Sequence, residues 1–195
     1  MELLLATRNP HKLEEFGRIL RPQTVVALPD DVELPPETGS SFAENALIKA
    51  QAAAEATGRP AIADDSGITA SALGGAPGIY SARFAGEDAT DEANLDKLLR
   101  SVPADGDRRV AYVCAVVYYV PGREPRVFEE TCEGTLANEP RGSGGFGYDP
   151  AFLPDDIADG RTMAELTAAE KDAISHRGKA VRAFAEWLDA KERAA

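Results

Sequence analysis

The sequence has few cysteines and no long apolar run. None of its apolar stretches approaches the ~20 residues that a membrane-spanning helix needs. Its two cysteines, Cys114 and Cys132, are far apart and lack the spacing of a metal site, so we expect buried thiols in a reducing compartment. The segment Met1-Glu2-Leu3-Leu4-Leu5 has neither a basic region nor a long apolar region, so no signal peptide is expected. These absences predict a cytoplasmic protein with no membrane partner.

Positive charge is also scarce. The chain has 21 Lys and Arg residues against 33 Asp and Glu residues, so its formal net charge is -12. A general nucleic-acid binder needs a basic surface, so nucleic acid is excluded as the expected partner. A phosphorylated small molecule would need local basic residues and a metal ion to overcome the repulsion. A hydrophobic fraction of 44% and a length of 195 residues predict one globular domain over residues 1–195.

Apolar patterning predicts helices alternating with strands, followed by a hairpin. Strands are expected at 3–6, 24–28, 61–65, 68–73, 110–120 and 126–134. Helices are expected at 10–20, 42–57 and 91–101, after a capping box at 167–170, and through an apolar stripe at 180–188. This order predicts a mixed α/β sheet with helices on its faces.

The segment Ala63-Asp64-Asp65-Ser66-Gly67 places two adjacent carboxylates at the expected end of a strand. Without a nearby cation, the two acids repel each other and raise each other's pKa. A divalent cation would relieve this repulsion, and hard cations prefer oxygen ligands. Since successive strand side chains point to opposite faces, Asp64 and Asp65 are expected to differ in role. A solvent-exposed acidic turn explains the pair alone equally well.

A polar loop connects the first strand to the first helix. Asn9 is expected to cap this helix, and Pro10 suits its first position. A helix start of this kind can bind an anion, with Thr7 and Asn9 as donors and Lys12 one turn further on. The P-loop pattern is absent, and an ordinary capped helix with an exposed lysine is the alternative.

Polar residues of the second helix and its preceding loop form another candidate site. Asn45 and Lys49 are four residues apart and share one helix face. Glu37, in the loop, could reach a metal ion, whereas Glu44 could serve only as the acid of a capping box. Taken singly, each of these residues is explained as a solvated polar side chain.

Two later segments suit a planar, anionic ligand. Phe146 lies in a glycine-rich loop and could stack on a base, while Asp149 could accept from a base or ribose. His176 could donate to a keto oxygen, and Lys171 or Arg177 could meet a phosphate or a base. The alternatives are a tight turn with Phe146 in the core and a helix junction with solvated charges.

Six motifs occur in a fixed order over nearly the whole chain: Thr7-x-Asn9-x-x-Lys12, Ser41-Phe42-x-Glu44-Asn45-Ala46-x-x-Lys49-Ala50, Ala63-Asp64-Asp65-Ser66-Gly67, Gly75-Ala76-Pro77-Gly78-x-Tyr80-Ser81-Ala82-Arg83, Gly144-Gly145-Phe146-Gly147-Tyr148-Asp149-Pro150 and Ser175-His176-Arg177-Gly178. Together they resemble the inosine/xanthosine triphosphate pyrophosphatases. The resemblance implies a mixed α/β fold with an elongated twisted sheet flanked by helices, two lobes with a central cleft, and a homodimer. It also implies Mg²⁺-dependent hydrolysis of ITP, dITP and XTP to the monophosphate and pyrophosphate, which cleanses the nucleotide pool.

The resemblance also assigns roles to individual residues. It implies that Asp65 is the catalytic acid-base group and a metal ligand, that Glu37 is a second metal ligand, and that Asp64 supports the site. The implied substrate-binding residues are Thr7, Arg8, Asn9, Pro10, His11, Lys12, Asn45, Lys49, Ser66, Phe146, Gly147, Tyr148, Asp149, Lys171, His176 and Arg177. Arg8 falls at a variable position of its motif.

Two other classes of function remain open from the sequence. An aspartyl-phosphate phosphatase also uses an acidic strand end, but its two acids are two residues apart rather than adjacent. A non-catalytic sensor would bind the nucleotide and Mg²⁺ without turnover. The density of polar clusters favours an enzyme over a sensor.

Overall fold

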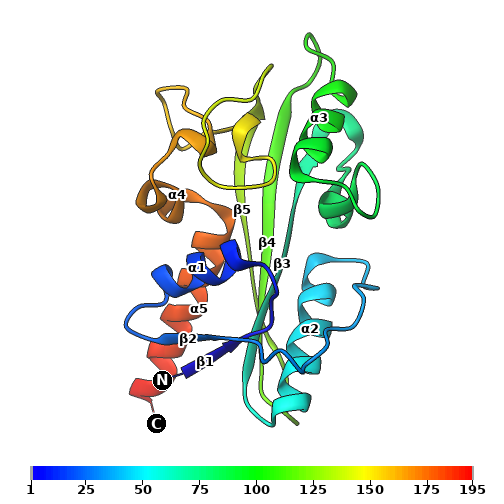
Figure 1. Ribbon diagram of the computed structural model, residues 1–195. Helices are drawn as coiled ribbons and strands as arrows, with labels where there is room; N and C mark the ends of the chain where they lie inside the picture. Colours follow the sequence, from blue (N-terminus) through cyan, green and yellow to red (C-terminus); the bar gives the residue numbers. More distant parts are fainter. Residues whose placement is uncertain (1, 195) are drawn as a thin grey trace. The chain divides into compact units, whose positions relative to one another are not determined.

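The computed structural model describes residues 2–194, and the strands in this range form one six-stranded sheet in the order β2-β1-β3-β4-β5-β6 (Figure 1). The strands are β1 Glu2–Leu5, β2 Thr24–Ala27, β3 Ala61–Ala70, β4 Arg109–Tyr119, β5 Arg126–Leu136 and β6 Phe152–Pro154. β1 pairs in parallel with β2 and β3, whereas β6 is antiparallel to β5. The α-helices are α1 Pro10–Ile19, α2 Phe42–Thr57, α3 Asp91–Ser101, α4 Ala168–Ile174 and α5 His176–Arg193. The predicted mixed α/β class is confirmed.

The chain divides into two compact units. The first comprises Met1–Asp65, Cys114–Glu130 and Arg177–Ala195, and the second comprises Ser66–Val113 and Thr131–His176. Because the divisions fall within β3, β4 and β5, each of these strands contributes residues to both units. The expected cleft and the expected single functional domain stay predictions.

The first unit has two separate apolar clusters, as the alternation of strand side chains requires. Leu3 and Leu5 pack in a cluster with Phe16 of α1 and Phe184 of α5. Their neighbour Leu4 packs instead in a cluster with the small residues of α2, which are Ala46, Ala50, Ala53 and Ala54. The helices α1 and α5 therefore cover one face of β1, and α2 covers the other (Figure 1).

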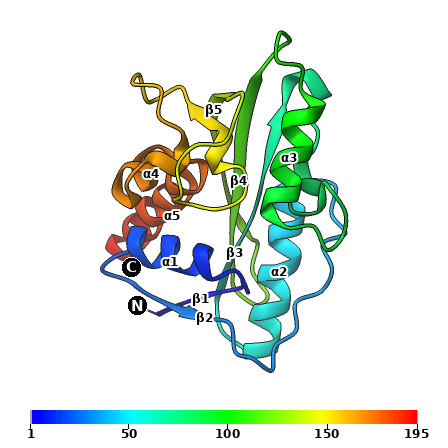
Figure 2. The same cartoon turned by 45° about the horizontal axis from the view of Figure 1, so that its top comes forward.

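The second unit has an apolar core of its own. Leu95 and Leu98 of α3 pack in one cluster with Ile68 of β3 and with Val110 and Tyr112 of β4. Figure 2 shows α3 lying along these strands. Residues from the segment that follows β5 complete the cluster, which includes Tyr148, Ala151, Phe152, Met163 and Leu166.

Most of the predicted helix starts are confirmed. The Asn9 side chain accepts from His11 N and Lys12 N, and Thr90 caps α3 by accepting from Ala93 N. Thr167 and Glu170 form a reciprocal capping box. Ser41 caps α2, but the carboxylate of Glu44 accepts from Ser40 rather than from Ser41.

The expected end of a strand at Asp64 and Asp65 is wrong. β3 continues through Ser66 and Gly67 to Ala70, so the acidic pair lies in its middle. Serine and glycine favour turns when judged locally, but here the neighbouring β4 keeps them in an extended strand. The predicted hairpin is confirmed by the adjacency of β4 and β5, and the short strand β6 was not predicted. Within residues 2–194, no helix is both long enough and apolar enough to cross a bilayer.

Candidate active site

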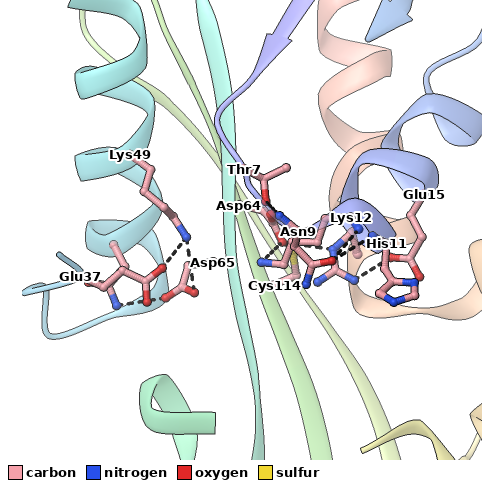
Figure 3. Close-up of polar contacts among 12 residues, drawn as sticks. Thr7, Asn9, His11, Lys12, Glu15, Glu37, Lys49, Asp64, Asp65 and Cys114 are labelled. Carbon is pink, nitrogen blue, oxygen red and sulfur yellow. Dashed lines mark hydrogen bonds and ion pairs between the residues drawn. The ribbon is translucent and has the colours of Figure 1, made fainter. Parts of the chain in front are cut away.

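Asp65 faces α2 and meets two of its polar side chains (Figure 3). Asn45 Nδ2 donates to Asp65 Oδ2 at 3.0 Å, and Lys49 Nζ lies 3.8 Å from Asp65 Oδ1. The same ammonium lies 2.6 Å from Glu37 Oε1, in the loop before the helix. Because Ser41 fixes the start of α2, Asn45 and Lys49 project one turn apart toward β3. One lysine thus links the two carboxylates expected to bind the metal.

Burial and the neighbouring charges together set the ionisation of this cluster. Burial raises the pKa of Asp65 above its ordinary value, against the opposing pull of Lys49, and the Glu37 carboxylate raises it further. A raised pKa brings a carboxyl group closer to the range in which a general base works well. Burial alone would lower the pKa of Lys49, but Asp64, Asp65 and Glu37 outweigh it and raise that pKa. Lys49 therefore remains a cation.

Asp64 meets a different set of partners on the opposite side of β3 (Figure 3). Lys12 Nζ lies 3.0 Å from Asp64 Oδ2, and Arg177 Nε donates to the same oxygen at 3.1 Å. Burial alone would raise the pKa of Asp64, but Lys12 and Arg177 outweigh it and hold the pKa far below its usual range. The two acids therefore have different partners on opposite sides of β3, as strand alternation predicts, and their separate roles stay predictions. Asp64 Oδ1 is buried without a hydrogen-bond partner among residues 2–194.

The loop before α1 is organised by short hydrogen bonds. Thr7 Oγ1 accepts from Asn9 N at 3.1 Å, and Asn9 Oδ1 accepts from His11 N at 2.9 Å and from Lys12 N at 3.3 Å. The oxygen of Asn9 is thus committed to the cap, which leaves its amide group as the donor suited to an anion. Arg8 turns away from this helix start and donates to the carbonyl oxygens of Leu28, Pro29 and Val32.

In the second unit, Asp149 organises the glycine-rich loop. Lys171 Nζ lies 2.7 Å from Asp149 Oδ2, and Tyr112 Oη donates to Asp149 Oδ1 at 3.0 Å. Phe146 N also donates to Asp149 Oδ2 at 2.9 Å. Both oxygens of this buried carboxylate are therefore engaged by the protein itself. In this geometry Asp149 holds the loop and Lys171 in place.

Aromatic rings flank the same cluster. Lys171 Nζ lies 4.8 Å from the centroid of the Phe146 ring, and Phe146 itself is half-buried. The His176 imidazole stacks on Tyr112, with ring centroids 4.5 Å apart and planes at 9°. Tyr148 is buried, and its hydroxyl donates to Ser81 O at 2.7 Å. Phe146, Lys171 and His176 thus combine an aromatic ring with two nitrogen donors.

Gly145 is required by this loop, and replacing it with alanine is expected to destabilise the protein by at least about 1 kcal/mol. Its φ is +68°, and an added Cβ would collide with the carboxylate of Asp149. Urea unfolding would measure the loss. Gly160→Ala is the matched control, because Gly160 has a φ of +75° and open space around its Cβ position. Equal losses in the two variants would show that the collision with Asp149 has no energetic weight.

The predicted site residues fall into one group in each unit. The first unit contains Thr7, Arg8, Asn9, Pro10, His11, Lys12, Glu37, Asn45, Lys49, Asp64, Asp65 and Arg177. The second contains Ser66, Phe146, Gly147, Tyr148, Asp149, Lys171 and His176. Arg177 was expected beside His176 in a base pocket, but its side chain bonds to Asp64 and Glu15.

Sequence reasoning missed two polar participants. Glu15 lies on α1 and accepts from Arg177 Nη1 at 2.7 Å, but a glutamate inside a helix reads as solvated. Tyr112 lies inside β4, where an aromatic residue reads as core. Strand alternation predicts that Tyr112 points to the face opposite Ala111 and Val113. It does not predict that Asp149 and His176 contact Tyr112.

The oxygen atoms around Asp65 suit a hard divalent cation. Glu37 and Asp65 supply carboxylate oxygens that already share the cation Lys49. Mg²⁺ typically takes only one or two carboxylates and completes its octahedron with waters and substrate phosphates. Two carboxylates are within that number, and within residues 2–194 no group of three or more His, Cys, Asp or Glu residues could hold a metal ion.

Comparison with known proteins agrees with both the fold and the motifs. A model of the Ham1 family matches residues 3–187. A dITP/XTP pyrophosphatase of Streptomyces coelicolor is 51% identical over 190 residues, which cover 93% of this chain and 94% of that protein. One of Geobacillus kaustophilus is 50% identical over 188 residues, which cover 92% and 90%. The structure of the Staphylococcus aureus Ham1 protein superposes with a TM-score of 0.86 at 40% identity, covering 98% of this chain and all of that one. This chain belongs to the Ham1 family.

Proposed function

We propose that the protein hydrolyses non-standard purine nucleoside triphosphates, namely ITP, dITP and XTP, to the monophosphate and pyrophosphate. The observation that carries this proposal is the arrangement of Asp65, Glu37 and Lys49, in which a buried acid of raised pKa lies beside a second carboxylate and a lysine. The relatives named dITP/XTP pyrophosphatase support the choice of substrate. Such an enzyme would remove these nucleotides from the pool.

Asp65 is the proposed general base. Its carboxylate accepts a proton from a water molecule, which attacks the α-phosphorus, and pyrophosphate leaves. Asn45 Nδ2 donates to Asp65 Oδ2 and so fixes the orientation of the carboxylate. When bound by Asp65 and Glu37, Mg²⁺ would neutralise charge on the triphosphate. Positioning and charge stabilisation supply most of the rate in such phosphoryl transfers.

The phosphates are proposed to bind at the start of α1 and at Lys49. Helix N-termini attract anions, and the Asn9 cap orients the first backbone N–H groups of α1. Lys12 and Lys49 add two cations near the acidic pair, which an anionic ligand requires in a protein of net charge -12. Thr7, Arg8, Pro10 and His11 stay predicted contacts of this segment.

The base is proposed to bind against residues of the second unit. The ring of Phe146 offers a stacking surface, and Lys171 and His176 offer donors for a 6-keto oxygen. The 6-amino group of adenine would leave such donors unpaired in a dry pocket, which discriminates strongly. Ser66, Gly147 and Tyr148 stay predicted substrate contacts.

A panel of nucleoside triphosphates with Mg²⁺ tests the proposal. We expect ITP, dITP and XTP to release pyrophosphate, and ATP to be hydrolysed at least about 100-fold less efficiently. Separating pyrophosphate from orthophosphate by chromatography identifies the reaction. Orthophosphate as the product would indicate a phosphatase, and tight binding without any product would indicate a sensor.

Three further expectations belong with this proposal. Mg²⁺ is the proposed cofactor, the homodimer is the proposed assembly, and the cytoplasm is the proposed location. Loss of turnover in EDTA that Mg²⁺ restores, but Ca²⁺ does not, would support the choice of metal. Light scattering of the purified protein would measure its assembly.

A further inference from the structure

Four side chains of alternating charge form a buried cluster in the first unit. This charge cluster consists of Lys12, Asp64, Arg177 and Glu15. Asp64 Oδ2 is shared by Lys12 at 3.0 Å and Arg177 at 3.1 Å, and Arg177 continues to Glu15 Oε2 at 2.7 Å. Lys12 is the most exposed member, with 14% of its side chain accessible against 2% for Arg177. A ligand would therefore meet the cluster through Lys12.

The cluster is electrically balanced. Two carboxylates face two cations, and the nearby thiol adds no charge, because burial raises the pKa of Cys114 well above its ordinary value. If Arg177 were absent, Asp64 would neutralise Lys12 alone, and Glu15 would leave the cluster with one net negative charge. A triphosphate approaching Lys12 would then meet a net negative charge instead of a neutral cluster.

We propose that Arg177 is a positioning residue for phosphate binding, which shares Asp64 with Lys12 and thereby keeps the charge of Lys12 available to a phosphate group. This inference rests on the proposed function of the site, and it differs from the contact with the base that family resemblance implies for Arg177. The Arg177 side chain is 2% accessible and makes its bonds to Asp64 and Glu15, on the same side of β3 as Lys12. At the other end of the cluster, Glu15 supplies the second negative charge, which balances the charge of Arg177.

The proposal predicts opposite effects for two neutral replacements. Arg177→Gln leaves the cluster with one net negative charge, so inorganic pyrophosphate is expected to bind about tenfold more weakly. Glu15→Gln leaves one net positive charge but keeps an oxygen that accepts from Arg177, so pyrophosphate is expected to bind about threefold more tightly. A purely structural role would weaken binding in both variants.

Calorimetric titration with inorganic pyrophosphate, with and without Mg²⁺, measures the pyrophosphate affinity of both variants. The ratio of kcat/KM for ITP to that for ATP, measured in the same variants, reports on base recognition and is expected to stay unchanged. Lys171→Gln is the matched control in the second unit, because Lys171 pairs with Asp149 there. It is expected to lower this ratio and to leave pyrophosphate affinity unchanged.

A lower ITP/ATP ratio with unchanged pyrophosphate affinity in Arg177→Gln would overturn the proposal in favour of base recognition. Weaker pyrophosphate binding in both Arg177→Gln and Glu15→Gln would overturn it in favour of a structural role. If Arg177→Gln does not fold, as thermal unfolding would reveal, Glu15→Gln decides alone: tighter binding supports the proposal, and unchanged or weaker binding contradicts it. Failure of the wild type to release pyrophosphate from any nucleotide would contradict the proposed function, while the pyrophosphate titrations would still test the charge cluster.

Discussion

Asp65→Asn is expected to lower kcat for ITP by roughly 10²- to 10⁴-fold, because the amide cannot accept a proton from water. The change is nearly isosteric, and the amide oxygen of the new side chain can still accept from Asn45 Nδ2, while Asn45 Oδ1 keeps its bond from Gly39 N. The fold should therefore survive, so that the loss reports on chemistry. Steady-state release of pyrophosphate, together with thermal unfolding of both proteins, would measure it.

Asp96→Asn is the matched control for this loss. Asp96 is an exposed acid on α3 that pairs with Arg100 at 2.6 Å, outside both groups of predicted site residues. Its turnover should equal that of the wild type. Full activity of Asp65→Asn with an unaltered metal requirement would remove Asp65 from the mechanism.

Asp64→Asn is expected to lower the free energy of unfolding by about 3–5 kcal/mol at neutral pH. It would leave Lys12 and Arg177 without their shared carboxylate in a buried setting. Urea unfolding in EDTA would measure the difference. Asp107→Asn breaks an exposed pair with Arg109 at 2.7 Å and is expected to leave stability nearly unchanged.

The stability lost in Asp64→Asn is also expected to depend on pH. The pKa of Asp64 is depressed in the folded state, so its contribution is complete above the unfolded-state pKa of about 3.9. That contribution disappears as the pH falls through the folded-state pKa. The gap in unfolding free energy between wild type and Asp64→Asn should therefore be constant from about pH 5 to pH 8 and should shrink in acid. A gap that widens in acid would contradict the assigned pKa direction.

Local signals in the sequence predicted the helices well. Asn9, Thr90 and Thr167 cap helices where they were expected to, because each cap depends only on residues within one turn. The strands were harder to bound. The acidic pair lies inside β3 rather than at its end, because pairing with β4 is a contact distant in sequence that local turn preference does not include.

The sequence by itself determined that the side chains of Asp64 and Asp65 point to opposite faces of their strand, since alternation along a strand holds for any register. Only the tertiary structure decided which partners each acid has. Asp65 meets Asn45 and Lys49 of α2, while Asp64 meets Lys12 of α1 and Arg177 of α5. The position of the Arg177 side chain could not be predicted from the sequence either, because it depends on a contact between residues distant in sequence. Arg177 follows His176 directly in the chain, yet its side chain is directed by a carboxylate more than a hundred residues away, and no local pattern encodes that contact.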